Sequence, residues 1–207
     1  MILKRMFDIV LSVFGIAVAA VPLAVIALAV RLSSPGPALH WSRRVGRDNH
    51  LFRMPKFRSM HVNTPQLATH LLTGSERFIT PVGRFLRRSS LDELPQLWSI
   101  LVGDMSFVGP RPALFNQDDL IAARTERGVH RLSPGLTGWA QINGRDELAI
   151  PEKVDLDVHY LNHRSFGLDL KILFLTGIKV FLREGIAQAG EERKQPTDSA
   201  ESKRRAA

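Results

Sequence analysis

The feature that most limits how this chain can fold is an uninterrupted apolar segment over residues 9–30. It contains no charged residue, and Ser12 alone carries a polar side chain. At about 1.5 Å per residue, a helix of this length reaches across a bilayer core of about 30 Å. A cleaved signal peptide fits poorly, because the segment is long and Asp8 interrupts its basic start. We therefore expect residues 1–34 to be embedded in a membrane.

Two geometries are compatible with this segment. Pro22 lies inside it and lacks a backbone N–H, which favours a kink. Basic residues flank both ends, and such residues favour the cytoplasmic side of a membrane. A helix–break–helix that enters and leaves the same leaflet places both flanks there, whereas a straight or kinked helix spans the bilayer. The residue pattern leaves both geometries open. The flanking residues are Lys4 and Arg5 before the segment, and Arg31, Arg43, Arg44 and Arg47 after it.

The charge of the chain indicates an anionic partner. The formal net charge is +8 and the pI is about 10.6, which suits nucleic acid, anionic lipid or a phosphorylated substrate. Nucleic acid is disfavoured, because there is one tyrosine, no nucleic-acid-binding motif and a membrane segment. The absence of cysteine excludes disulfides and thiolate chemistry. Residues 188–207 are charged and poor in apolar residues, which predicts a disordered tail.

The remaining pattern predicts a mixed α/β fold that is predominantly helical, with a small catalytic domain over residues 35–187. A turn at 46–49 predicts a hairpin between 38–44 and 51–60. Helices are expected at 84–88, from about 91 or 92, at 117–127 and at 151–163, and a short strand is expected at 139–142. Residues 168–182 form an amphipathic helix that lies either in the membrane interface or in the core.

Asp92 and Glu93 are two adjacent carboxylates at an expected helix start. Ser90 and Glu93 match a capping box, so Glu93 is open to a capping role and Asp92 to that of a first-turn acid. Alternatively, the two carboxylates hold Mg²⁺ and a diphosphate, or one of them attacks phosphorus as a nucleophile. Both interpretations remain open on spacing alone.

Several basic residues are candidates for binding phosphate. Arg84, Arg87 and Arg88 share one helical face, which forms either a phosphate site or a solvated or lipid-facing patch. Arg111 stands between Pro110 and Pro112, which stiffen the backbone and aim the side chain unless this is a plain surface turn. Lys56 and Arg145 are weaker candidates. The histidines have no ligand spacing, and HExxH and Walker-type motifs are absent from the sequence.

Five motifs occur in order along the chain: KRMFD at 4–8, KFRSM at 56–60, SLDELPQ at 90–96, GDMSFVGPRP at 103–112 and PGLTGWAQINGR at 134–145. With them, the chain resembles the bacterial sugar transferase family, the monotopic polyprenyl-phosphate phosphoglycosyl transferases, over roughly residues 4–185. One departure concerns the apolar segment, where family members often carry serine before the proline and this chain has Val21.

The resemblance implies that a phosphosugar moves from a UDP-sugar to polyprenyl (undecaprenyl) phosphate, releasing UMP. It implies Asp92 as the nucleophile and Glu93 as its helper through Mg²⁺, the expected cofactor. It also implies a re-entrant helix broken at Pro22, at the cytoplasmic face of the bacterial inner membrane. The residues that it places at the substrate are Lys56, Arg87, Arg111 and Arg145, together with Pro110 and Pro112.

Two other functions fit parts of the pattern. A non-catalytic, membrane-anchored module would use the arginines to bind an anionic partner and would not depend on Asp92. A phosphatase would use Asp92 as the nucleophile and water as the acceptor, so its activity would need no lipid.

Overall fold

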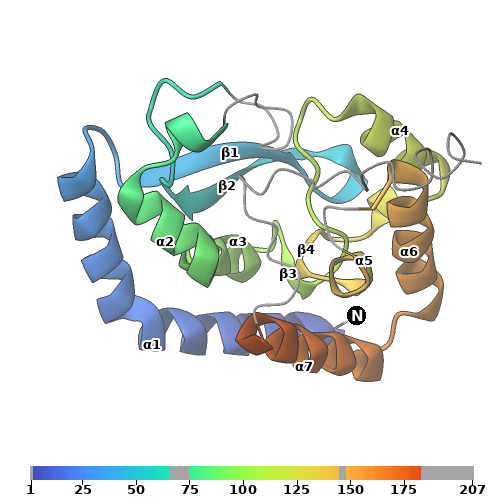
Figure 1. Ribbon diagram of the computed structural model, residues 1–207. Coiled ribbons are helices and arrows are strands. Elements are labelled where there is room, and N and C mark those ends of the chain that lie inside the picture. The colour runs from blue at the N-terminus through green and yellow to red at the C-terminus, as the bar shows by residue number, and fades with distance from the viewer. Residues whose placement is uncertain (1, 66–74, 145–147, 183–207) are drawn as a thin grey trace, which may run out of the picture.

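The computed structural model describes residues 2–65, 75–144 and 148–182, and it confirms a mixed α/β fold that is mostly helical (Figure 1). Arg145 and the predicted tail at 188–207 lie outside the described residues. The α-helices are α1 (Ile2–Ser33), α2 (Pro81–Ser89), α3 (Gln96–Val102), α4 (Asp118–Glu126), α5 (Trp139–Ile142), α6 (Ile150–His163) and α7 (Phe166–Leu182). The strands are β1 (Leu39–Val45), β2 (Leu51–Phe57), β3 (Ser106–Val108) and β4 (Gly135–Thr137). Single 3₁₀ turns are η1 (Arg47–Asn49), η3 (Ser75–Phe78), η4 (Leu91–Glu93) and η5 (Val129–Arg131).

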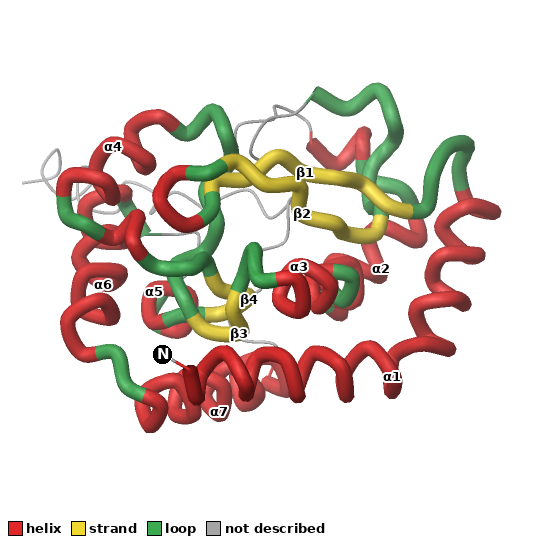
Figure 2. Tube along the Cα trace, turned by 180° about the vertical axis from the view of Figure 1, so that it is seen from behind, coloured by secondary structure: helices red, strands yellow, loops and turns green. Residues whose placement is uncertain are grey.

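Helix α1 underlies the rest of the molecule. Its first part runs beside α7, and its second part turns away and rises along α2 (Figures 1 and 2). Pro22 lies inside this helix, and an internal proline is a standard cause of such a bend. Among the described residues, α1 is the one helix with the length and apolarity to cross a membrane. Only 6% of its most apolar 18-residue stretch is buried inside the protein. The predicted apolar helix with an internal proline is therefore confirmed.

The hairpin predicted around residues 46–49 is also confirmed. β1 and β2 pair antiparallel, with Leu39 opposite Phe57 and Val45 opposite Leu51. The turn needs the left-handed conformation at Asp48 (φ 53°) and Asn49 (φ 61°), and these residue types tolerate it.

β3 and β4 form a short parallel pair, with Ser106 opposite Gly135. A Cβ atom at Gly135 would collide with the backbone of Gly109, and one at Gly138 would collide with the Gly109 carbonyl. These glycines let two chain segments touch through their backbones. The contact fixes the segment that continues from β3 into residues 110–112.

Two local predictions are wrong. Ser90 does not form the predicted capping box: it has left-handed geometry (φ 55°), it ends α2, and its side chain makes no capping hydrogen bond. The following residues make one 3₁₀ turn, and α3 begins only at Gln96, after Pro95. The strand predicted at 139–142 is the helical turn α5, and the strand in this region is β4, just before it. Short apolar runs fit either state, so periodicity could not decide.

The helices predicted at 84–88, 117–127, 151–163 and 168–182 are confirmed as α2, α4, α6 and α7. The alternatives left open for α7, core or interface, are not exclusive. Ile172 is fully buried in the main core, whereas Phe174 remains 69% exposed. Helix α7 therefore has one face in the core and a second, apolar face outside it.

Candidate active site

Asp92 lies in the 3₁₀ turn η4, between α2 and α3, and is only 8% exposed. The left-handed Ser90 reverses the chain at the end of α2 and leads directly into this turn. Leu91, next to Asp92, packs against the apolar cluster of Val30, Phe57 and Leu86. The turn that carries Asp92 is therefore held, through Leu91, against β2 and the second part of α1.

The electrostatic surroundings of Asp92 are unusual for a carboxylate. Burial, together with the negative charge of Glu93, raises the pKa of Asp92 to about 6. Lys56 and Arg87 lie close enough to oppose this rise. The carboxylate remains mostly ionised at neutral pH, but it is more basic than an ordinary aspartate. A basic, poorly solvated carboxylate is a better nucleophile than an exposed one.

Two cations from different elements converge on Asp92. Lys56 comes from β2, and burial, assisted by Arg44 and Arg87, lowers its pKa to about 8. Arg87 comes from α2; its Nε donates to Ser59 Oγ (3.0 Å), and burial lowers its pKa. Both therefore carry positive charge at neutral pH in a place with little water.

The three arginines predicted to share one face of α2 differ in their burial and in their neighbours. Arg87 is half-buried and lies close enough to Asp92 for its charge to lower the pKa of that carboxyl, whereas Arg84 and Arg88 are exposed. Arg84 makes a 3.5 Å surface ion pair with Glu76. Arg87 is therefore placed to act on a group bound at Asp92.

The turn at residues 110–112 faces the second carboxylate. Arg111 Nη2 donates to Glu93 Oε1 across 3.1 Å, which brings together two of the residues predicted from sequence to lie in the site. The carbonyls of the turn are fixed in succession: Pro110 accepts from Gly135 N (2.8 Å), Arg111 from Arg124 Nη1 (2.8 Å), and Pro112 from Arg44 Nη1 (3.1 Å). The side chain of Arg111 therefore projects from a rigid backbone.

Sequence reasoning missed the support behind this turn. Arg124 of α4 pairs with Asp157 of α6 across 2.7 Å, and both residues are buried. Burial raises the pKa of Asp157, and the Arg124 guanidinium opposes that rise. Nothing in the polar pattern of α4 marks Arg124 as buried, because its partner lies on another helix.

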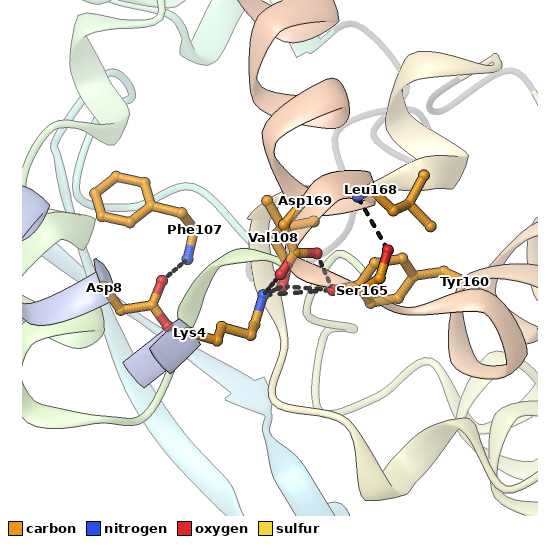
Figure 3. A network of polar contacts seen from close by, with 8 residues as sticks. All are labelled: Lys4, Asp8, Phe107, Val108, Tyr160, Ser165, Leu168 and Asp169. Carbon is orange, nitrogen blue, oxygen red and sulfur yellow. Dashed lines mark hydrogen bonds and ion pairs between the residues drawn. The ribbon is translucent and has the colours of Figure 1, made fainter. Parts of the chain in front are cut away.

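The first turn of α1 is joined to the site by a second polar network (Figure 3). Lys4 Nζ donates to the Val108 carbonyl (2.9 Å), to Asp169 Oδ2 (2.7 Å) and to the hydroxyl of Tyr160 (3.3 Å). That hydroxyl donates in turn to Asp169 Oδ1 (2.6 Å), and burial together with this bond raises the pKa of Tyr160. Val108 ends β3, three residues before Arg111.

Two neighbours of Lys4 make similar attachments. Asp8 Oδ1 accepts from the backbone N–H of Phe107 (3.0 Å), and Arg5 donates to the carbonyls of Ile100 (2.6 Å) and Leu101 (2.7 Å). Arg5 thereby satisfies the C-terminal carbonyls of α3, the helix that follows Asp92. Lys4 and Arg5, interpreted from sequence as a basic flank and as part of the first family motif, are together with Asp8 internal anchors of the fold.

Asp92 and Glu93 are the residues that could hold a divalent cation. No group of three or more histidine, aspartate or glutamate side chains is arranged for metal binding within residues 2–65, 75–144 and 148–182. Mg²⁺ commonly takes one or two protein carboxylates and completes its shell with water and phosphate oxygens. Two adjacent acids with Lys56, Arg87 and Arg111 close by fit that mode of binding.

Comparison with known proteins matches residues 1–183 to the model of a family described as "Bacterial sugar transferase". "Uncharacterized sugar transferase EpsL" of Bacillus subtilis (strain 168) is 42% identical over 91% of this chain and 92% of that protein. "UDP-glucose:undecaprenyl-phosphate glucose-1-phosphate transferase" of Escherichia coli (strain K12) is 42% identical over 88% of this chain and 41% of that protein. "Undecaprenyl-phosphate glucose phosphotransferase" of Komagataeibacter xylinus is 42% identical over 85% of this chain and 35% of that protein. The chain thus spans most of the Bacillus protein but less than half of the other two.

Proposed function

The chain belongs to the bacterial sugar transferase family, and on that premise we propose that it transfers a phosphosugar from a UDP-sugar to polyprenyl (undecaprenyl) phosphate. UMP is released, and the lipid product is a polyprenyl diphosphosugar. This is the first membrane step in assembling a bacterial polysaccharide or glycoconjugate. The observation that carries the proposal is Asp92, a buried carboxylate with a pKa of about 6, set between Lys56 and Arg87.

In the first step, a carboxylate oxygen of Asp92 attacks the phosphorus that bears the sugar. A bond forms between that oxygen and phosphorus, the phosphorus–oxygen bond to UMP breaks, and UMP leaves with the electron pair. Lys56 and Arg87 hold the phosphate oxygens and offset the repulsion between the anionic donor and the carboxylate. Arg111, aimed from its rigid turn toward Glu93, supplies a third cation.

In the second step, a phosphate oxygen of the lipid acceptor attacks the same phosphorus. The acyl phosphate bond breaks, and the Asp92 carboxylate is restored. Because each step brings only one bulky substrate to the carboxylate, the soluble donor and the membrane-bound acceptor can use the same site in turn.

Mg²⁺ is the cofactor that we propose, held by Asp92 and Glu93 with water and substrate phosphate completing its shell. When bound, it would supply positive charge next to the diphosphate. The protein's own part is to keep both carboxylates in one turn and to hold Glu93 with Arg111.

We expect the pH profile of kcat/KM to be bell-shaped, with limbs near pH 6 and pH 8. Below about 6, Asp92 takes up a proton and stops acting as a nucleophile, and above about 8, Lys56 loses the charge that holds phosphate. Steady-state rates across this range measure both limbs. Lys56→Arg should shift only the alkaline limb upward, because a guanidinium stays protonated. An alkaline limb that does not move in this variant would assign it to another group.

We propose the re-entrant geometry for α1, because both of its ends are attached to the same catalytic domain. At the start, Lys4 and Asp8 bind β3. At the end, Arg58 of the segment after β2 binds the Ser34 carbonyl (2.7 Å). A spanning helix would separate these two attachments by the thickness of the bilayer. The bend in α1 and basic residues at both ends fit entry and exit through the cytoplasmic leaflet.

This geometry is testable with cysteines, since the native chain has none. Leu3→Cys and Leu32→Cys place single thiols at exposed positions at the two ends of α1. Both should react with a membrane-impermeant maleimide in inverted inner-membrane vesicles, and neither should react in intact spheroplasts. Reaction of the Leu3→Cys thiol in spheroplasts would show a spanning helix.

Exposed apolar side chains support contact with the membrane beyond α1. They gather on three more helices, and α7 lies beside the first part of α1 in both views (Figures 1 and 2). A surface of this kind, with cations on α2 and α7, suits the boundary between headgroups and acyl chains. The residues are Phe85 on α2, Trp98 and Val102 on α3, and Leu170, Phe174 and Val180 on α7.

The nucleotide product tests the proposed function. Purified protein would be incubated with Mg²⁺, a panel of UDP-sugars and polyprenyl phosphate, and the released nucleotide identified by chromatography. We expect UMP, with no more than one equivalent per enzyme when the lipid is omitted. UDP would mean ordinary glycosyl transfer, and continuous UMP release without the lipid would mean that water is the acceptor.

A further inference from the structure

Arg58 is buried, at 5% exposure, although it lies outside the catalytic cluster. Its guanidinium reaches the last turn of α1 and the residues that follow it. Nη1 donates to the Pro35 carbonyl (2.6 Å), while Nη2 donates to the Ser34 carbonyl (2.7 Å) and hydroxyl (2.9 Å) and lies 3.3 Å from the Val30 carbonyl. One side chain thus binds the backbone at three positions where the membrane helix ends.

The chain around this contact is shaped to admit the guanidinium. Gly36 has a left-handed backbone (φ 118°), and a Cβ atom there would collide with Arg58 Nη1. A side chain at this position would therefore be strained by the backbone conformation and would also displace the guanidinium. Gly36 and the carbonyls that follow the end of α1 thus form a close-fitting site for the Arg58 guanidinium.

The same short segment carries active-site contacts on either side of Arg58. Lys56, two residues earlier, acts on Asp92, and Ser59, one residue later, accepts from Arg87 Nε. The backbone of Ser59 also lies against Gly83 of α2, where a Cβ atom would collide with the Ser59 carbonyl. Lys56 and Ser59 are therefore held in place by their own contacts with the catalytic site, and Arg58 joins the segment between them to the end of α1.

We propose that Arg58 is a positioning residue that fixes the height of the catalytic site relative to the membrane-embedded second part of α1. This inference rests on the proposed function, because it concerns how the site meets an acceptor that is confined to the bilayer. The soluble donor arrives from water and does not depend on that height. The lipid phosphate stays at the level of the headgroups and must meet the phosphosugar on Asp92 there.

Loss of Arg58 should leave the fold intact. The second part of α1 is also held by the apolar cluster of Val30, Phe57 and Leu86, with Leu23 and Ile26 packed against it. Without the guanidinium, this part would remain docked but could pivot against β2. A misplacement of about 1 Å between reacting groups can reduce a rate about 100-fold.

The test separates the two half-reactions in Arg58→Gln and Arg58→Lys. With UDP-sugar alone, the burst of UMP should stay within about twofold of wild type, whereas transfer from the loaded enzyme to the lipid should fall about 100-fold. Arg58→Lys should behave like Arg58→Gln, because one ammonium cannot reproduce the forked set of hydrogen bonds. Arg31→Gln removes a positive charge from an exposed residue at the same end of α1 and should leave both half-reactions unchanged.

Equal loss in both half-reactions, or no loss in either, would overturn the proposal.

A measurement that does not depend on turnover separates failure of this proposal from failure of the proposed function. Nitroxides on Leu28→Cys and Leu51→Cys, two exposed positions on α1 and at the hairpin tip, report the distance between helix and domain in nanodiscs. A pulsed electron paramagnetic resonance distribution that broadens in both Arg58 variants, but not in Arg31→Gln, supports the proposal whatever the reaction. An unchanged distribution contradicts it.

Discussion

Asp92→Asn should lower turnover by about three orders of magnitude or more, because an amide is a poor nucleophile and the enzyme has no second route to the intermediate. Phosphosugar transfer to the lipid would be measured for both proteins under identical conditions. Asp119→Asn is the matched control, since it makes the same change at an exposed position on α4. Near-normal turnover in Asp92→Asn would rule out the covalent mechanism.

The same substitution should make the protein more stable at neutral pH. Burial raises the pKa of Asp92 above its unfolded value, so the folded state binds this proton more tightly than the unfolded state does. Above about pH 6 the ionised carboxylate therefore costs stability in full, and this cost shrinks as the pH falls from about 6 to the unfolded pKa of 3.8. Asparagine removes the buried charge, so its unfolding midpoint at pH 7.5 should exceed that of wild type. An inactive but stabilised variant separates chemistry from folding.

Removal of divalent cations should reduce activity to background. The donor diphosphate, Asp92 and Glu93 are all anionic. Their combined negative charge exceeds the positive charge of Lys56, Arg87 and Arg111, so a divalent cation is needed to balance it. EDTA would be added to active enzyme and the rate followed, then Mg²⁺ added in excess. We expect full recovery with Mg²⁺, and no inhibition by EDTA that has first been saturated with Mg²⁺. A rate that EDTA does not change would remove the cation from the scheme.

The apolar helix α1 is attached to the proposed catalytic site at two places. The start of α1 binds β3 and α3, which adjoin Arg111 and Asp92 respectively. Its end binds the segment that carries Lys56 and Ser59. Residues on both sides of the proposed catalytic cluster are thereby attached to α1. This arrangement suits a reaction in which one substrate never leaves the bilayer.

Features that depend on local chemistry could be predicted from the sequence. The hairpin was predictable because Asp48 and Asn49 accept a left-handed turn, and α6 and α7 because their apolar periodicity is long. The cluster of Asp92, Glu93 and Arg111 was predictable because carboxylates and a proline-stiffened arginine already suggest phosphate chemistry. Lys56 and Arg87 were weaker predictions, and the fold alone brings them to Asp92.

Features that depend on distant partners could not be predicted in the same way. Ser90 fits a capping box locally, but the chain uses it to end α2. Arg124 and Asp157 are ordinary helix-surface residues in sequence and become a buried pair only when α4 meets α6. Lys4 has the pattern of a membrane-flanking charge, yet its partners lie more than a hundred residues away. In each case the local pattern allows several uses, and tertiary packing selects one.

The most direct test of the central claim is the mass of the peptide that contains Asp92 after the enzyme meets its donor without lipid. The protein would be quenched in acid, digested and analysed by tandem mass spectrometry. The account predicts a sugar phosphate on Asp92, absent from Asp92→Asn and discharged when polyprenyl phosphate is added before quenching. A sugar phosphate on another residue, or transfer to lipid at full rate with no adduct at any time, would contradict it.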